Sequence, residues 1–355
     1  MERNDSAARW FIGTLAAIVL LLAVFAGVCI YTDPFCHYHA PLSGYNYTDY
    51  IPYYLNDGII RNYDFTGILM GSSMTENFKK TEADRLFGGN FIKIPLYGAS
   101  LKEMNEQLQR VYERSKTPEY VIRSVDEYTL LQGEDETNYP LSDVEHLYNE
   151  NIFDDVKYLF NLQILKDHTL KILNDPLPAG EPSIDFDRYC SWEHPSGKET
   201  VVSQYSVSDT PGEEAVLTQE AREKMIGNIR CNLMEIAYEH PETTFICFFP
   251  PYSICNWEIM KYTNRLHLKV ELYRAAAEEI LKCPNIRLFS FDAQYDFVCD
   301  LDKYSDPYHY NAAGNSALLK LMSEGVGQLT KENYQDYFNE VEKFYSEYDY
   351  AWLHE

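Results

Sequence analysis

Basic residues are scarce in this chain. Its 355 residues include 30 Lys and Arg against 55 Asp and Glu, which gives a formal net charge of −25. Nucleic acids and anionic membrane surfaces are bound through clustered Lys and Arg. The composition therefore argues against nucleic acid as a partner and favours a neutral or cationic substrate, or one bound in a locally positive cleft.

Zinc-type cysteine spacing is also missing. The eight cysteines form no C-x-x-C pair, and such closely spaced ligands are typical of structural zinc sites. The segment Cys36-His37-Tyr38-His39 contains ligand residue types but has no partner motif. We interpret it as a structural segment, with metal binding as the alternative, and we predict no metal and no cofactor. Pairing of Cys283 with Cys299 stays open.

One long hydrophobic run stands near the N-terminus. Residues 10–31 carry no charge, and at a rise of ~1.5 Å per residue such a helix crosses the ~30 Å hydrocarbon layer of a bilayer. Arg3 and Arg9 precede the run, and no Lys or Arg follows until Arg61. The positive-inside rule then predicts a cytoplasmic tail over 1–9 and a single-pass anchor over 10–31, with the remaining chain outside the cell membrane.

A cleaved signal peptide is the alternative interpretation of this run. Val24-Phe25-Ala26 has the small residues of a cleavage site, and Ala26-Gly27-Val28-Cys29 faintly resembles a lipoprotein box. We favour the uncleaved anchor because the run exceeds the roughly 7–15 residues of a signal core and continues past both sites. All three interpretations export the body of the protein.

The rest of the chain alternates strand-like and helix-like segments, which predicts an α/β fold with a parallel sheet. The strand-like segments are 66–70, 91–94, 119–125, 243–249 and 286–290, and the helix-like ones are 101–116, 217–239, 256–281 and 312–325. Parallel strands place the loops that follow them at one edge of the sheet. Open α/β sheets bind ligands at that carboxyl edge.

We predict one large domain over 61–330, after a juxtamembrane segment at 32–60 and before a helical tail at 331–355. An insertion at about 127–215 interrupts the alternation, with one helix near 154–173. A long insertion of this kind typically forms a cap or lid over a site. Trp192 and His194 within it are candidate substrate contacts, although ordinary packing explains either residue alone.

Two distant segments contain the residues of a catalytic triad. Ser73 follows the first strand in Gly71-Ser72-Ser73-Met74-Thr75, and Asp306 and His309 lie three residues apart in Asp306-Pro307-Tyr308-His309. A serine hydroxyl becomes a nucleophile when an imidazole accepts its proton, and a carboxylate orients that imidazole. We therefore predict Ser73 as nucleophile, His309 as base and Asp306 as the orienting acid.

These segments resemble the sequence blocks of the SGNH/GDSL hydrolase superfamily. Gly71-Ser72-Ser73 is similar to the GDS-containing first block, Gly98 to the glycine of the second block, and Asp306-Pro307-Tyr308-His309 to the D-x-x-H last block. The resemblance implies a flavodoxin-like three-layer α/β/α fold with a central parallel sheet. It also implies an oxyanion hole formed by the backbone N–H groups of Ser73 and Gly98.

The sequence departs from the family pattern at two places. Ser72 stands where the first block has Asp, and Ser124-Val125-Asp126-Glu127 stands where a G-x-N-D block is expected. The asparagine of that block normally completes the oxyanion hole, so its donor is missing or comes from elsewhere. Asn77, about one turn beyond Ser73, is a candidate substitute, and Asp126 is a candidate substrate contact.

The expected function is that of a membrane-anchored extracytoplasmic serine esterase or O-acyltransferase acting on a cell-envelope polysaccharide or related surface polymer. The GSS form and the anchor also resemble the teichoic-acid D-alanylation protein and SGNH-like polysaccharide O-acetyltransferases. The alternative is a non-catalytic, SGNH-like component that binds glycan or a partner in a cell-envelope machine. A phosphodiester hydrolase is a more distant alternative.

Overall fold

The computed structural model describes residues 2–49, 51–139, 144–207 and 212–354. The chain divides into two units, of which the first comprises Met1–Tyr63 with Pro140–Asp185 and the second Asp64–Tyr139 with Phe186–Glu355. The insertion predicted at 127–215 is therefore divided between the two units. Residues 140–143 and 208–211 of that insertion, and the first residue of the tail predicted at 1–9, lie outside the described residues.

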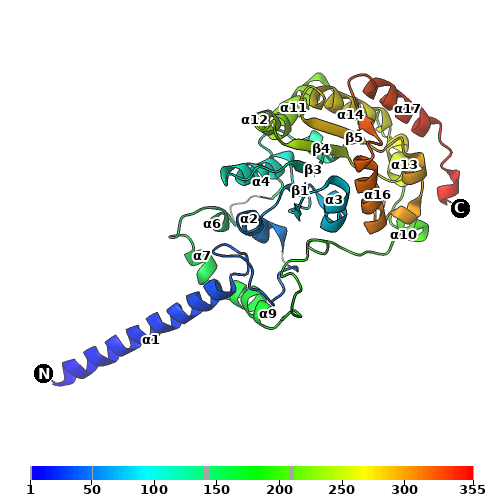
Figure 1. Ribbon diagram of the computed structural model, residues 1–355. Coiled ribbons are helices and arrows are strands. Elements are labelled where there is room, and N and C mark those ends of the chain that lie inside the picture. The colour runs from blue at the N-terminus through cyan, green and yellow to red at the C-terminus, as the bar shows by residue number, and fades with distance from the viewer. Residues whose placement is uncertain (1, 50, 140–143, 208–211, 355) are drawn as a thin grey trace. The chain divides into compact units, whose positions relative to one another are not determined.

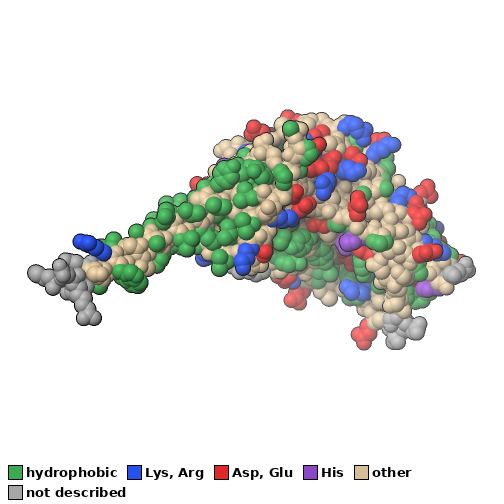
Figure 2. Space-filling model, turned by 90° about the horizontal axis from the view of Figure 1, so that it is seen from below, with side chains coloured by type: hydrophobic (Ala, Val, Ile, Leu, Met, Phe, Trp, Pro, Cys, Tyr) green, Lys and Arg blue, Asp and Glu red, His purple; other side chains and the backbone are tan. Residues whose placement is uncertain are grey.

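The first unit begins with the long helix α1, Glu2–Thr32. Its segment Ser6–Thr32 has a mean hydropathy of 2.7 over its most apolar window, and it is long and apolar enough to cross a membrane. Hydrophobic side chains cover most of this helix (Figure 2). A signal sequence has the same character, so the choice between anchor and signal depends on how the end of α1 is held.

The end of α1 is integrated into the first unit. Thr32 is buried, and its hydroxyl lies 3.3 Å from the hydroxyl of Thr169. Asp33 follows with a fully buried side chain, which accepts hydrogen bonds from the backbone N–H groups of His37, Tyr38 and His39 and from the hydroxyl of Tyr158. This arrangement gives Cys36-His37-Tyr38-His39 a structural role, since its backbone wraps around one carboxylate.

The remaining helical segments of the first unit are short. The single helix predicted near 154–173 is instead a series of turns, because the side chain of Asn161 accepts hydrogen bonds from the N–H groups of Gln163 and Ile164 and starts a new helix there. The segments are α2 (Pro52–Asn62), α6 (Glu145–Tyr148), α7 (Val156–Leu159), α8 (Leu162–Ile164), a π-helical turn (Leu165–Thr169) and α9 (Leu170–Leu173).

The second unit contains a six-stranded sheet with the order β2-β1-β3-β4-β5-β6. The strands are β1 (Gly67–Met70), β2 (Phe91–Lys93), β3 (Tyr120–Ser124), β4 (Thr244–Phe249), β5 (Ile286–Ser290) and β6 (Gln328–Leu329). The first five are parallel, as the alternating pattern predicts, and their apolar runs are almost wholly buried.

The sheet has one edge strand that was not predicted from the sequence. Strand β6 pairs with β5 in the antiparallel direction, so the sheet is mixed. The chain reaches β6 through Gly325 and Gly327, which both have positive φ and form a short return. This turn connects the end of the helix Ala312–Ser323 to β6.

Helices flank the sheet in two packing groups (Figure 1). One group pairs α3 (Lys80–Phe87) with α16 (Ala312–Ser323), and the other joins α4 (Leu101–Glu113), α11 (Gln219–Ile229), α14 (Leu266–Ile280) and α17 (Tyr334–Glu347). The helix predicted at 256–281 is two helices, α13 (Ile254–Tyr262) and α14, because Asn264 adopts a left-handed conformation between them. A π-helical turn (Arg230–Met234) joins α11 to α12 (Glu235–Glu239).

The remaining segments of the second unit are short. They are the 3₁₀ turns η1 (Ser73–Thr75), η5 (Leu301–Lys303) and η6 (Ala351–His354), and the helices α5 (Glu127–Leu130), α10 (Lys198–Ser203) and α15 (Tyr295–Val298). Of these, η1 directly follows β1 at the carboxyl edge of the sheet. Its first residue is Ser73.

Candidate active site

A tight turn after β1 presents Ser73. Gly71 has a φ of +142°, and a Cβ built there would lie 2.6 Å from Oγ of Ser124, so a larger residue would clash. Ser72 then caps η1, because its hydroxyl accepts a hydrogen bond from the N–H of Met74 at 3.2 Å. The turn leaves Ser73 partly exposed between buried neighbours.

The structure brings the three predicted triad residues together. Oγ of Ser73 lies 2.9 Å from Nε2 of His309, and Nδ1 of the same imidazole lies 2.8 Å from Oδ2 of Asp306. With the proton of neutral His309 on Nδ1, facing the carboxylate, Nε2 is free to accept the hydroxyl proton of Ser73. This is the order of groups that serine activation requires.

Backbone groups hold Asp306 in place. Its Oδ1 accepts the N–H groups of Tyr308 at 2.7 Å and His309 at 2.8 Å, which leaves Oδ2 for the imidazole. Burial alone would raise the pKa of Asp306, but the hydrogen bonds and charge of His309 and these two N–H donors lower it below its usual value. Asp306 is therefore ionised near neutral pH.

The pKa of His309 is shifted in the opposite direction to that of Asp306. Burial alone would lower the pKa of His309, but the hydrogen bond and charge of Asp306, with further contributions from Asp126 and Glu76, raise it above its usual value. The surrounding acids thus stabilise the imidazolium form. That form arises when His309 accepts the proton of Ser73.

Asp126 does not occupy the position of a substrate contact. Only 1% of the residue is exposed, and its two carboxylate oxygens each accept a 2.8 Å hydrogen bond, one from the hydroxyl of Ser72 and one from that of Ser124. Burial raises the pKa of Asp126 above its usual value. The prediction is therefore corrected: Asp126 links the end of β3 to the nucleophile turn.

The predicted oxyanion donors lie at the same edge of the sheet. Gly98 has a φ of +64°, and a Cβ there would lie 3.2 Å from the ring of Tyr139. Asn77 is almost fully buried, and its side-chain oxygen accepts the backbone N–H of Trp192 at 2.9 Å. Its Nδ2 has no hydrogen-bond partner among the described residues. The oxyanion roles of Ser73, Gly98 and Asn77 stay predictions.

Trp192 lies against the triad. Its ring meets that of His309 edge-on, with centroids 5.8 Å apart and an interplanar angle of 90°. The ring of His194 stacks on the indole of Trp192, with centroids 5.1 Å apart. Trp192 is half-buried and His194 is exposed. Their roles in substrate binding stay predictions.

Two charged residues near Trp192 were not predicted from the sequence. Lys93 on β2 is fully buried, and its ammonium group donates to the backbone oxygen of Glu76 at 2.7 Å and to the hydroxyl of Ser191 at 2.9 Å. Glu76 is also buried, which raises its pKa to about 7 despite opposing contributions from Trp192, Lys93 and His309. The sequence signal for this buried ammonium group is a lysine within the apolar run Phe91–Ile94.

Replacing Lys93 by methionine should destabilise the protein by about 2–4 kcal/mol, because buried acceptors lose a charged donor. The free energy of unfolding, measured with denaturant, provides the test. Lys79→Met is the matched control: this lysine pairs with Glu82 at 3.9 Å on the surface, and its loss should cost less than about 1 kcal/mol. Equal losses in the two variants would contradict a structural role for Lys93.

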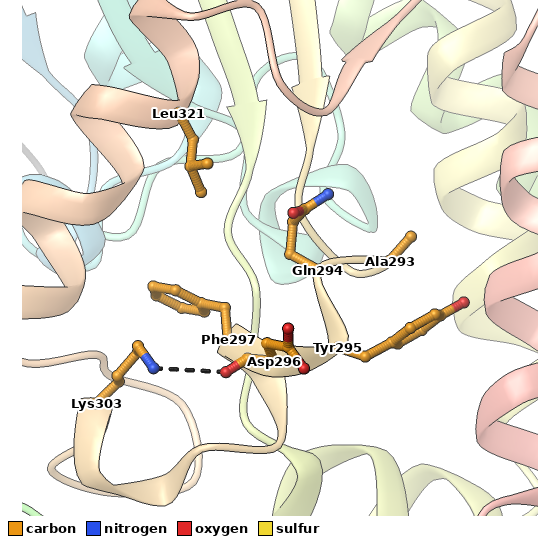
Figure 3. A pocket seen from close by; sticks show the side chains of 7 residues that line it. All are labelled: Ala293, Gln294, Tyr295, Asp296, Phe297, Lys303 and Leu321. Atoms are coloured by element: carbon orange, nitrogen blue, oxygen red, sulfur yellow. Dashed lines mark hydrogen bonds between the residues drawn. The ribbon is translucent and has the colours of Figure 1, made fainter.

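A separate pocket of about 340 Å³ lies beyond the end of β5 (Figure 3). The amino group of Lys303 donates to the backbone oxygen of Asp296 across it at 3.4 Å. No triad residue lines this pocket; its lining is Ala293, Gln294, Tyr295, Asp296, Phe297, Lys303 and Leu321. Within residues 2–49, 51–139, 144–207 and 212–354, no group of three His, Cys, Asp or Glu side chains could hold a metal ion.

Comparison of the chain with family models, curated proteins and solved structures finds no match. The functional argument therefore depends on the geometry of the site and on the resemblance of its sequence blocks.

Proposed function

We propose that the chain is a serine esterase or O-acyltransferase of the SGNH type. The observation that carries the proposal is the continuous relay from Ser73 through His309 to Asp306, with hydrogen bonds of 2.9 and 2.8 Å. The relay lies at the carboxyl edge of a largely parallel sheet, where α/β enzymes bind their substrates. A purely structural protein has no need for this order of groups.

The proposal includes a flavodoxin-like, three-layer arrangement for the second unit. Its first five strands follow the order 2-1-3-4-5, which is the doubly wound order of that fold. The two separate helix groups, α3 with α16 and α4 with α11 and α14, are what a layer on each face of the sheet would produce. The antiparallel β6 adds one edge strand to this plan.

In the proposed mechanism, Ser73 attacks the carbonyl carbon of an ester while His309 accepts its proton. The imidazolium then returns the proton to the leaving oxygen, and an acyl group remains on Ser73. Water or a sugar hydroxyl next attacks this acyl-enzyme with His309 again as base. Asp306 keeps the imidazole in the productive tautomer throughout.

Negative charge that develops on the carbonyl oxygen requires nearby donors. We assign this role to the N–H groups of Ser73 and Gly98, with Nδ2 of Asn77 as third donor. The support for Asn77 is that its oxygen is already fixed by Trp192 while its buried amide donor lacks a partner among the described residues. A buried donor without a partner is costly unless a ligand uses it.

The proposed cellular location of the protein depends on α1. We propose an uncleaved single-pass anchor, because Cys29 and Thr32 at its end are buried in the first unit and Phe25 packs on Phe160 with ring centroids 6.1 Å apart. Cleavage after Ala26 would remove that contact. With Arg9 on the cytoplasmic side, the catalytic unit would act outside the cell membrane on a surface polysaccharide or related polymer.

A panel of esters tests the proposed activity. The purified full-length protein is incubated with an aryl acetate and with acetylated sugars, in the presence and absence of a sugar acceptor. We expect an acetyl adduct on the peptide that contains Ser73, followed by transfer to water or to the acceptor. If no donor in the panel yields an adduct or turnover, the non-catalytic, glycan-binding alternative is favoured.

The pH dependence of kcat/KM should report the protonation of His309. Catalysis needs the neutral imidazole, and the acids around it raise its pKa, so activity should fall on acidification with a midpoint above the ordinary value of about 6.5. Steady-state assays from pH 4 to pH 9 measure this midpoint. A profile that stays flat down to about pH 5 would exclude His309 as the base.

A further inference from the structure

The first unit exposes a group of large apolar side chains near α7. Phe153 is 83% exposed, Ile152 is 72% exposed and Leu162 is 62% exposed, which is unusual for neighbouring residues of a folded unit. We call the whole set the apolar platform. It consists of Ile152, Phe153, Val156, Phe160, Leu162 and Leu170.

The apolar platform is continuous with α1. Helix α7 and the following π-helical turn pack against α1, and α7 and α9 lie beside its C-terminal end (Figure 1). Within this contact, the ring of Phe160 stacks on that of Phe25 with an interplanar angle of 26°. The thiol of Cys29 also reaches the backbone oxygen of Tyr158 at 3.8 Å.

The position of Phe25 sets the depth of the platform. Phe25 precedes Thr32, the last residue of the apolar helix, by seven residues, which corresponds to ~10 Å along a helix axis. When α1 spans a bilayer over its apolar length, Phe160 therefore lies within the hydrocarbon layer, deeper than the point at which the helix leaves it. Its exposed neighbours would meet lipid at that level instead of water.

The charged groups around the platform agree with an interfacial position. Lys157 and Lys166 are exposed within the same segment, and lysine side chains can extend from apolar surroundings to the headgroup layer. Of the nearby acids, Asp154 bonds to Asn149 and Asp155 to Tyr38. Asp167 is the one exposed acid among residues 152–170.

We propose that the apolar platform inserts into the lipid leaflet that α1 leaves, so that the first unit holds the membrane by a spanning helix and an interfacial element together. Lipid is the occupant favoured by the continuity with α1 and by the depth of Phe160. Apolar side chains flanked by lysines are the composition of elements that lie at such an interface.

The test uses the full-length protein in phosphatidylcholine–phosphatidylglycerol vesicles with a lipid-soluble photoactivated label. Labelled peptides are identified by mass spectrometry. We expect label on α1 and on residues 152–170.

In the double variant Ile152→Ser/Phe153→Ser, labelling of 152–170 should fall several-fold while that of α1 stays unchanged. Both residues are so exposed that thermal unfolding should also be unchanged. Tyr238→Ser, in the second unit, is the matched control and should change neither the labelling of residues 152–170 nor thermal unfolding.

Each other outcome overturns the inference. Label on α1 but not on 152–170 would leave the spanning helix intact and refute the platform's contact with lipid. Label on neither segment would refute both. Chemical cross-links between platforms of two copies in the vesicles, together with weak labelling of 152–170, would show that a second copy of the chain covers the surface instead of lipid.

Discussion

Replacement of Ser73 by alanine should abolish covalent labelling by a fluorophosphonate and lower ester turnover by about 10⁴-fold or more. The reason is that Oγ of Ser73 is the atom that faces Nε2 of His309, at 2.9 Å. Alanine removes this atom without adding bulk, so the turn after β1 should keep its shape. Intact-mass spectrometry after exposure to the probe measures the loss directly.

The matched control is Ser203→Ala, which removes an exposed hydroxyl at the end of α10. Labelling in that variant should equal that of the unmodified protein. A Ser73→Ala variant that still reacts with the probe at the original rate would identify another nucleophile and refute the proposed triad.

Changing Asp306 to asparagine should lower kcat by about 10³–10⁴-fold with little change in KM. Two backbone N–H groups bond to Oδ1 of Asp306, so the oxygen of the asparagine amide should take that place and direct its NH₂ group toward Nδ1 of His309. Nδ1 then has to accept, and the imidazole proton moves to Nε2. In this tautomer His309 cannot accept the proton of Ser73.

Steady-state kinetics on the ester that the unmodified protein turns over best provide the measurement. Asp302→Asn alters an exposed acid four residues earlier in the chain and should leave kcat within about twofold, since surface charges away from the reacting atoms contribute little. A fall in kcat of less than about tenfold for Asp306→Asn would mean that the imidazole is oriented by other groups.

The features that the sequence predicts well are those set by local pattern. Apolar runs such as Thr244–Phe249 form buried strands because helices cover both faces of a parallel sheet. The proximity of Ser73, Asp306 and His309 was predicted because the serine follows such a strand and the other two residues share one short loop. Ser100 similarly marks the start of α4, where it forms a capping box with Glu103.

The features that the sequence does not predict depend on contacts between distant segments. Residues 140–185 join the first unit through bonds such as that from the hydroxyl of Tyr158 to Asp33 and that from Tyr148 to the backbone of Tyr53. No periodicity in either segment indicates these partners. Asp126 was assigned to the substrate for the same reason, since its bond to Ser72 arises only when β1 and β3 pair.

The bond from Ser72 to Asp126 also couples two positions that lie 54 residues apart in the chain. An aspartate at position 72, as in the first block of the SGNH/GDSL hydrolases that this turn resembles, would bring a second carboxylate into the buried space that Asp126 already fills. Two such charges in one site repel each other, and one of them would have to bind a proton. The turn of this chain therefore has its acid in the loop that follows the neighbouring strand β3, and proteins with the same turn should carry an acid at one of these two positions but not at both.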